Sequence, residues 1–198
     1  MNEFGLERAA TAQILQTLEA NKSLALLAGT QRILMAFPFS AVATPYVVKL
    51  DNGKQYFANC AWDAVAFHVM LQQPLQIDSF CHQSGELIKV RIGQGGEVDA
   101  DPPHAIVFLS RPASQWWQNI IDTCSNTMVF FSKPQHLESW HADHPLAASG
   151  QTLSIEQTIK LSGPLYKDRM SMDYERPSAD RLRQHFAQLD LAGSFWQI

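Results

Sequence analysis

Residues 59–71 read NCAWDAVAFHVML, an almost wholly apolar run with one thiol and one carboxylate near its start. A run of this length and composition favours a buried helix. Cys60 and Asp63 are three positions apart, so on a helix they share one face. At the start of a helix, unpaired N–H groups and the helix dipole favour the thiolate form of a cysteine. The stretch therefore predicts a buried helix that presents a nucleophile and an acid side by side.

The size and charge of the chain indicate one medium-sized soluble protein. Its 198 residues are enough for one domain with a sizeable core. The formal net charge of −4 gives no general attraction to nucleic acid or to anionic membranes. No apolar run approaches the roughly 20 residues that span a bilayer, and the N-terminus lacks the features of a signal peptide. We therefore expect a cytoplasmic protein that binds neither nucleic acid nor membrane.

The three cysteines, Cys60, Cys81 and Cys124, are too few and too widely spaced for a disulfide framework. The chain has no Cys-x-x-Cys pair, which argues against a structural zinc site. Free thiols are the expectation in a reducing compartment. Each thiol taken alone can be a reactive group or a packing residue, because most free cysteines are simply small buried hydrophobic residues.

The rest of the chain alternates short strands with helices. Asp51-Asn52-Gly53-Lys54 predicts a hairpin turn, since Asn-Gly tolerates positive φ. Asn59 is a good N-cap residue for the helix that follows it. The expected strands are residues 32–37, 46–50, 55–58, 75–80, 87–92, 104–109 and 128–131. The other expected helices are residues 6–27, 113–123, 134–143, 154–161 and 177–189.

These elements predict an α+β fold in which short, mostly antiparallel strands form hairpins and helices pack around them. We expect residues 1–30 to form an N-terminal helical extension. Residues 31–198 are expected to form the main α+β domain with a helical C-terminal tail, and residues 163–176 an irregular charged loop within it.

Cys124 is the second candidate thiol. It lies in DTCSN, residues 122–126, which we place at the junction between the helix at 113–123 and the strand at 128–131. Such junctions often carry reactive side chains, although a satisfied loop thiol is an equally good interpretation. Cys81 follows an expected strand, beside His82, where a core or supporting position is the more frequent case.

With these residues in view, the chain resembles the alkylmercury (organomercurial) lyase family. The resemblance centres on YFANCAWDA, residues 56–64, where the family has an aromatic strand running into a Cys-Ala-x-Asp helix. CHQSG at 81–85 is similar to the family's Cys-x-x-(Thr/Ser)-Gly turn, and Cys124 with FFS at 130–132 and Trp140 resembles its second catalytic segment. The resemblance covers residues 32–161 and implies an alkylmercury-lyase-like fold in a divergent member with a shortened N-terminal region.

The resemblance also implies an activity, a lyase that cleaves a carbon–mercury or related carbon–metal or carbon–metalloid bond in a small organometallic substrate. In the family, two cysteines bind the mercury and an aspartate delivers a proton to the departing carbon. Carried over, Cys60 is the attacking thiolate, Cys124 the second thiolate, Asp63 the proton carrier and Cys81 a structural residue. Soft thiolates suit a soft cation such as mercury. No tightly bound cofactor is implied, and an external thiol or a mercury-handling protein accepts the product.

Two questions stay open in the sequence. The family pattern places the second cysteine five residues before a Phe-Phe pair, whereas Cys124 stands six before Phe130 and Ser125 occupies the five-residue position. A one-residue shift at a strand end reverses side-chain direction, so either Cys124 or Ser125 faces Cys60. The alternative function is a non-catalytic thiol protein that binds or carries Hg(II) or Cu(I), with Asp63 turned away from the thiols. A third hypothesis is a structural or regulatory protein in which Cys124 is turned away from Cys60.

Overall fold

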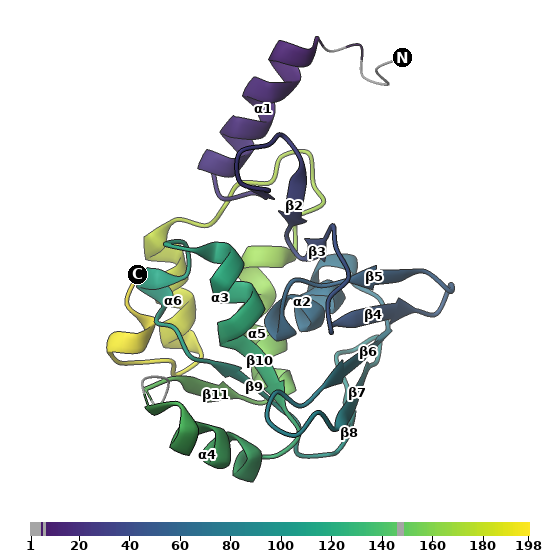
Figure 1. The fold of residues 1–198 in the computed structure, drawn as a ribbon, viewed down its shortest axis with the longest axis vertical. Helices are drawn as coiled ribbons and strands as arrows, with labels where there is room; N and C mark the ends of the chain where they lie inside the picture. The colour runs from purple at the N-terminus through teal and green to yellow at the C-terminus, as the bar shows by residue number, and fades with distance from the viewer. Residues whose placement is uncertain (1–4, 6, 146–148) are drawn as a thin grey trace.

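The computed structural model of the protein describes residues 5, 7–145 and 149–198. Figure 1 shows helix α2 (Ala61–Leu71) near the centre, with a five-stranded sheet on one side of it and a three-stranded sheet on the other. All strand pairs in these two sheets are antiparallel. The structure therefore has the predicted α+β class, with helices around short antiparallel strands.

The five-stranded sheet has the order β5-β4-β6-β7-β8. Its first hairpin turns at Gly53, whose φ of 81° is the positive value expected of an Asn-Gly turn. Its strands are β4 (Val47–Leu50), β5 (Gln55–Phe57), β6 (Leu75–Phe80), β7 (Leu87–Ile92) and β8 (Val98–Asp101). The sequence analysis predicted four of these strands to within two residues. It missed β8, because the short sequence VDAD carries too few β-branched or aromatic residues to be recognised.

The three-stranded sheet has β9 (Ile106–Leu109) at its centre, between β10 (Met128–Phe131) and β11 (Gln151–Leu153). All four residues of β10 are buried, so this strand runs through the core. The strands β9 and β10 were predicted, whereas the half-polar β11 was not. Helix α4 (Pro134–Asp143) follows β10 with the predicted bounds.

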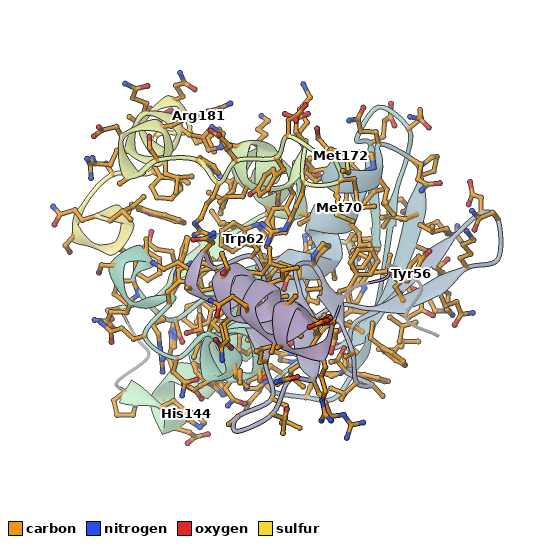
Figure 2. The ribbon with its side chains drawn as sticks, turned by 90° about the horizontal axis from the view of Figure 1, so that it is seen from above. Tyr56, Trp62, Met70, His144, Met172 and Arg181 are labelled. Atoms are coloured by element: carbon orange, nitrogen blue, oxygen red, sulfur yellow. The ribbon has the colours of Figure 1, made fainter. Side chains whose placement is uncertain are left out.

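Helix α2 is the centre of the core, and nine of its eleven residues are buried. It packs against α5 (Ile155–Tyr166), and the Trp62 indole Nε1 donates to Ser162 Oγ at 2.8 Å between the two helices. In the view from above, Trp62 lies near the middle of the molecule (Figure 2). This packing fixes α5 beside the start of α2.

Helix α5 is longer than predicted. It begins with a capping box between Ser154 and Gln157 and continues past Leu161, through Pro164, to Tyr166. A proline inside a helix leaves the carbonyl four residues earlier without its usual donor. Here that carbonyl, of Lys160, lies 3.0 Å from His185 Nε2 on α6 (Ala179–Gln188). The neighbouring helix thus compensates for the proline, which is why the helix does not stop where the sequence suggests.

The N-terminal helix is shorter than predicted. Helix α1 runs over Arg8–Ala20, has no buried residue and stands away from the rest of the molecule (Figure 1). Lys22 adopts a positive φ of 60° and turns the chain into β1 (Ala25–Leu26), which pairs with β2 (Ile33–Ala36) and through it with β3 (Phe39–Ser40). The predicted start at residue 6 lies outside the described residues. The division of the chain at residue 30 stays a prediction.

The helix predicted at 113–123 is wrong. The structure has a short 3-10 turn, η1 (Ala113–Gln115), and then a separate helix α3 (Ile120–Thr127). Asn119, with φ of −149°, interrupts the helical path, and its side chain accepts from the Asp122 N–H as the N-cap of α3. The segment around Cys124 is therefore helical. A last 3-10 turn, η3 (Ser194–Trp196), ends the chain, and within the described ranges no helix is both long and apolar enough to cross a membrane.

Candidate active site

Cys60 and Asp63 lie at the start of α2. Cys60, rather than the predicted Asn59, is the N-cap, since its Sγ accepts a hydrogen bond from the Asp63 N–H at 3.3 Å. Asn59 is held by other partners, because its Nδ2 donates to the Pro38 carbonyl and to the Asp63 carboxylate, both at 3.0 Å. Cys60 and Asp63 are each 1 % exposed. The beginning of the helix thus carries a thiol and an acid on one buried face.

Cys124 reaches the same place from α3. The Sγ atoms of Cys60 and Cys124 and a carboxylate oxygen of Asp63 all lie within 4.8 Å of one another. Cys124 is buried, whereas Ser125 is exposed. Because this segment is helical, neighbouring side chains differ in direction by about 100°, and the argument from strand register does not apply. Cys124, and not Ser125, faces Cys60.

Two side chains hold the Asp63 carboxylate. The hydroxyl of Tyr166, the last residue of α5, donates to Oδ1 at 2.5 Å, and Asn59 donates to Oδ2. Burial raises the pKa of Asp63 to about 6, and the hydrogen bonds from Tyr166 and Asn59 keep it from rising further. An acid with such a pKa can exchange a proton near neutral pH. Tyr166 is not predicted as a site residue from the sequence, because it lies 103 residues from Asp63 in a segment without a recognisable motif.

The surroundings raise the pKa of both thiols, which favours their protonated forms in the free site. Burial raises the pKa of Cys60 well above its usual value, and a hydrogen bond with Cys124 and the Asp63 charge add to the effect. The hydrogen bond with Cys60 acts to lower the pKa of Cys124, but burial and the Asp63 charge together leave it raised. At the helix start, the hydrogen bond from the Asp63 N–H acts to lower the pKa of Cys60, as expected, but burial has the larger effect in the free site.

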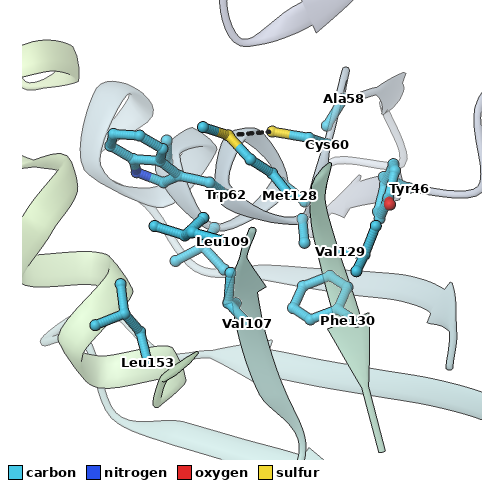
Figure 3. Packing of buried hydrophobic residues seen from close by; sticks show 14 of the residues in the cluster. Tyr46, Ala58, Cys60, Trp62, Val107, Leu109, Met128, Val129, Phe130 and Leu153 are labelled. Atoms are coloured by element: carbon cyan, nitrogen blue, oxygen red, sulfur yellow. Dashed lines mark hydrogen bonds between the residues drawn. The ribbon is translucent and has the colours of Figure 1, made fainter. Parts of the chain in front are cut away.

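The three groups line a small cavity of about 40 Å³ that is partly open to solvent. Its walls are mainly apolar and aromatic, and Trp62, Trp116 and Trp117 contribute three indole rings. Met128, at the start of β10, also lines it, with Sδ 4.0 Å from the Cys60 Sγ (Figure 3). A cavity with sulfur donors and apolar walls is suited to a soft metal ion that carries an organic group.

Cys81 lies apart from this cluster. Its Sγ is 3.4 Å from His136 Nδ1, and the same nitrogen lies 2.8 Å from Ser132 Oγ. Burial acts to raise the pKa of Cys81, but hydrogen bonds from Ser84 and Ser132 lower it to about 6. The thiol therefore belongs to a polar contact between the turn after β6 and the beginning of α4. Its structural role stays a prediction.

Comparisons with known proteins agree with this geometry. A family model described as alkylmercury lyase matches residues 39–167, which include all three residues of the cluster. The alkylmercury lyase of Bacillus cereus is 32% identical over 120 residues, which make up 61% of this chain and 52% of that protein. The alkylmercury lyase of Staphylococcus epidermidis is 26% identical over 149 residues, or 75% of this chain and 64% of that one.

The fold has a solved counterpart. The crystal structure of the mercury-bound form of MerB2 is similar to this chain with a TM-score of 0.69 and 23% sequence identity. The match covers 86% of this chain and 80% of that one. The chain spans about half the length of the Bacillus cereus relative. The fold is therefore shared with a protein whose structure contains mercury.

Proposed function

Because the family model covers well over half of its length, the chain belongs to the alkylmercury lyase family, and we propose that it cleaves carbon–mercury bonds by protonolysis. The substrate class is a small organomercurial, R–Hg–X, in which X is a thiolate or another anion. The observation that carries the proposal is the buried cluster of Cys60, Asp63 and Cys124, with two sulfurs and a carboxylate within 4.8 Å.

The two thiols supply both the ligands and the protons of the reaction. Cys60 Sγ displaces X from mercury, and Cys124 adds the second sulfur. Thiolates are the ligands that a soft cation prefers, and two of them weaken the remaining carbon–mercury bond. That bond then breaks, and its electron pair takes up a proton to give R–H. The balance is R–Hg–X plus two Cys–SH to R–H, Hg(S–Cys)₂ and HX, so one thiol proton ends on carbon and the other leaves with X.

Asp63 carries the proton between sulfur and carbon. As a carboxylate it accepts a proton from a thiol when mercury binds, and as an acid it donates this proton to the departing carbon. Its pKa of about 6 suits both steps near neutral pH. Its carboxylate is held in place by Tyr166 and Asn59, so it is already oriented before the reaction begins. Tyr166 and Asn59 thus act as positioning residues.

The product mercury ion must leave two thiolates, which requires an acceptor of the same chemistry. We propose that an external thiol or a mercury-handling protein takes it up, and that no cofactor is tightly bound. The three free thiols agree with a reducing compartment, for which the cytoplasm is our expectation.

The hypothesis of a metal carrier and that of a structural or regulatory protein make predictions that the geometry does not meet. A carrier would have Asp63 turned away from the thiols toward backbone N–H groups. In the structure its carboxylate is bound by two side chains and lies near both sulfurs. A structural or regulatory protein would have Cys124 turned away from Cys60, and the two sulfurs are close. These observations favour the lyase.

Substitution of the acid tests the proposal. The Asp63→Asn variant should bind one equivalent of methylmercury through its two thiols but release no methane. The Cys124→Ser variant should bind methylmercury more weakly and lose turnover, whereas Ser125→Ala, its exposed neighbour, should behave as the wild type. Methane release by Asp63→Asn at the wild-type rate would refute the role of Asp63.

A further inference from the structure

Two arginines stand in the wall of the cavity that holds Cys60. Arg169 and Arg176 come from the segment between α5 and α6, beyond the residues that match the family model. Arg169 is held by the protein itself, because it donates to the Ser23 carbonyl at 2.9 Å and to the Tyr174 hydroxyl at 3.1 Å. The bond to Ser23 ties the segment to the region before β1, which it approaches in Figure 1, and the bond to Tyr174 lies within the segment.

Arg176 has no comparable partner. Over residues 7–145 and 149–198, its guanidinium takes part in no ion pair and no hydrogen bond, while other arginines pair with Asp122 and Asp180. It packs instead on the Trp117 ring, 4.6 Å from the ring centroid. The residue is half-buried, so part of its hydration is lost. A guanidinium keeps its charge in such a place and has five N–H donors in a planar fork.

The charges around the cavity are unbalanced. Among the described lining residues, Arg169 and Arg176 are the two cations and Asp63 is the only acid. Both oxygens of Asp63 already accept hydrogen bonds from Tyr166 and Asn59. The cavity that the reacting thiols line therefore has a surplus of positive charge, and Arg176 brings unused N–H donors to its wall.

We propose that Arg176 forms a subsite for a carboxylate carried by the mercury complex. This inference rests on the proposed function and extends it to the substrate class: organomercurials that enter the cavity with an anionic group. A carboxylate fits the fork of a guanidinium through two parallel hydrogen bonds, and the apolar wall strengthens this contact by excluding water. The aromatic ring of Trp117 holds the guanidinium in orientation before the ligand arrives.

The carboxylate has two possible sources. It can belong to the organic group that is cleaved, or to the thiol that holds the mercury as X before Cys60 displaces it. Either source places a carboxylate a few bonds away from mercury, and Arg176 can bind a carboxylate from either one. Pairs of substrates that differ only in one carboxylate distinguish the two sources.

The test uses two matched comparisons with the full chain. Phenylmercury and 4-carboxyphenylmercury, each with 2-mercaptoethanol, vary the organic group. Phenylmercury with mercaptoacetate or with 2-mercaptoethanol varies the thiol. Each mixture is followed by the rate of tryptophan fluorescence quenching as mercury reaches the thiols, and by release of benzene or benzoate. The variants are Arg176→Gln, Arg176→Lys and, as control, Arg181→Gln, an exposed arginine on α6 away from Trp62 (Figure 2).

The wild type should prefer the carboxylate form in one comparison by about 10- to 100-fold, the range of one charge-assisted hydrogen-bonded pair. Arg176→Gln should abolish this preference, Arg176→Lys should keep part of it, and Arg181→Gln should leave it unchanged. The comparison in which the preference occurs identifies the source of the carboxylate. Equal rates for all mixtures, or a preference that survives in Arg176→Gln, would overturn the subsite. Quenching without hydrocarbon release would count against the proposed lyase, while the quenching rates would still decide the subsite.

Discussion

The hydrogen bond between Tyr166 and Asp63 makes a quantitative prediction. In Tyr166→Phe the ring stays and only the hydroxyl that donates to Asp63 Oδ1 at 2.5 Å is removed. A hydrogen bond to a charged group contributes about 1.5–3 kcal/mol, and one pKa unit corresponds to about 1.4 kcal/mol. The loss should therefore raise the pKa of Asp63 by about one to two units from its value near 6. The sign follows because this bond favours the ionised carboxylate.

The pH dependence of turnover measures this change. Asp63 must be ionised in the free enzyme to accept a thiol proton, so kcat/KM with methylmercury should fall below about pH 6 in the wild type. In Tyr166→Phe this acid limb should move up by about one to two pH units. The infrared band of the protonated Asp63 carboxyl, identified by its absence in Asp63→Asn, should shift over the same range.

Tyr46→Phe is the matched control, since Tyr46 is a buried tyrosine that has no hydrogen bond with Asp63 among the described residues. Its acid limb should stay near pH 6. If Tyr166→Phe folds and retains its acid limb at the wild-type pH, the hydroxyl does not lower the pKa of Asp63, and the reasoning from this hydrogen bond is wrong.

Three further predictions concern the stability of the fold and of the site. Asp63 has a folded-state pKa of about 6 against 3.8 for its ordinary value, so its contribution to stability is present below pH 3.8 and is lost as pH rises through 6. Asp63→Asn should therefore raise the free energy of unfolding at pH 8, by at most about 3 kcal/mol. Urea titrations at pH 4 and pH 8 measure this change. A variant that is less stable than the wild type at pH 8 would contradict the burial of an unfavourable charge. Phe67→Ala, in the fully buried face of α2, should lower the free energy of unfolding by about 3–5 kcal/mol, and a loss below 1 kcal/mol in the same titration would contradict the central place of this helix. Ser154→Ala removes the N-cap of α5 and should lower the free energy of unfolding by about 1 kcal/mol, whereas Ser194→Ala, inside η3 and without a side-chain hydrogen bond among the described residues, should lower it less; thermal unfolding measures both.

The local signals in the sequence were sufficient for most of the fold. The strands of the β6–β7 hairpin were predicted to the residue, because apolar residues recur along both strands and a turn sequence lies between them. Helix α2 was predicted because it is apolar on nearly all sides, as a helix enclosed by two sheets and α5 must be. The pair of Cys60 and Asp63 followed from helix geometry alone.

The errors arose where a distant partner decides the local structure. Helix α5 continues through Pro164 because His185, from another helix, contacts the freed carbonyl. Asn59 gives up the N-cap position to Cys60 because Pro38 and Asp63 bind its amide. Such contacts join residues that are far apart in the sequence, so they cannot be predicted from a window of neighbouring residues.

Cys124 and Tyr166 show the same limit of prediction from local sequence. Placing Cys124 at a junction between a helix and a strand left open whether Cys124 or Ser125 faces Cys60, and the N-cap at Asn119 is the local signal that could have identified α3. With the segment helical, the register question disappears and Cys124 meets Cys60. Tyr166 had no signal at all in the sequence, and only the packing of α5 against α2 brings its hydroxyl to Asp63.

Methane release from methylmercury is the most direct test of the central claim that Cys60, Asp63 and Cys124 act together on a carbon–mercury bond. The reduced protein is incubated with methylmercury and excess thiol in D₂O, and headspace gas and free Hg(II) are measured over several turnovers. If the central claim holds, the wild type releases singly deuterated methane and Hg(II) in equal amounts, and Cys60→Ser releases neither. Tight binding of methylmercury by the wild type, with no methane formed, would contradict it.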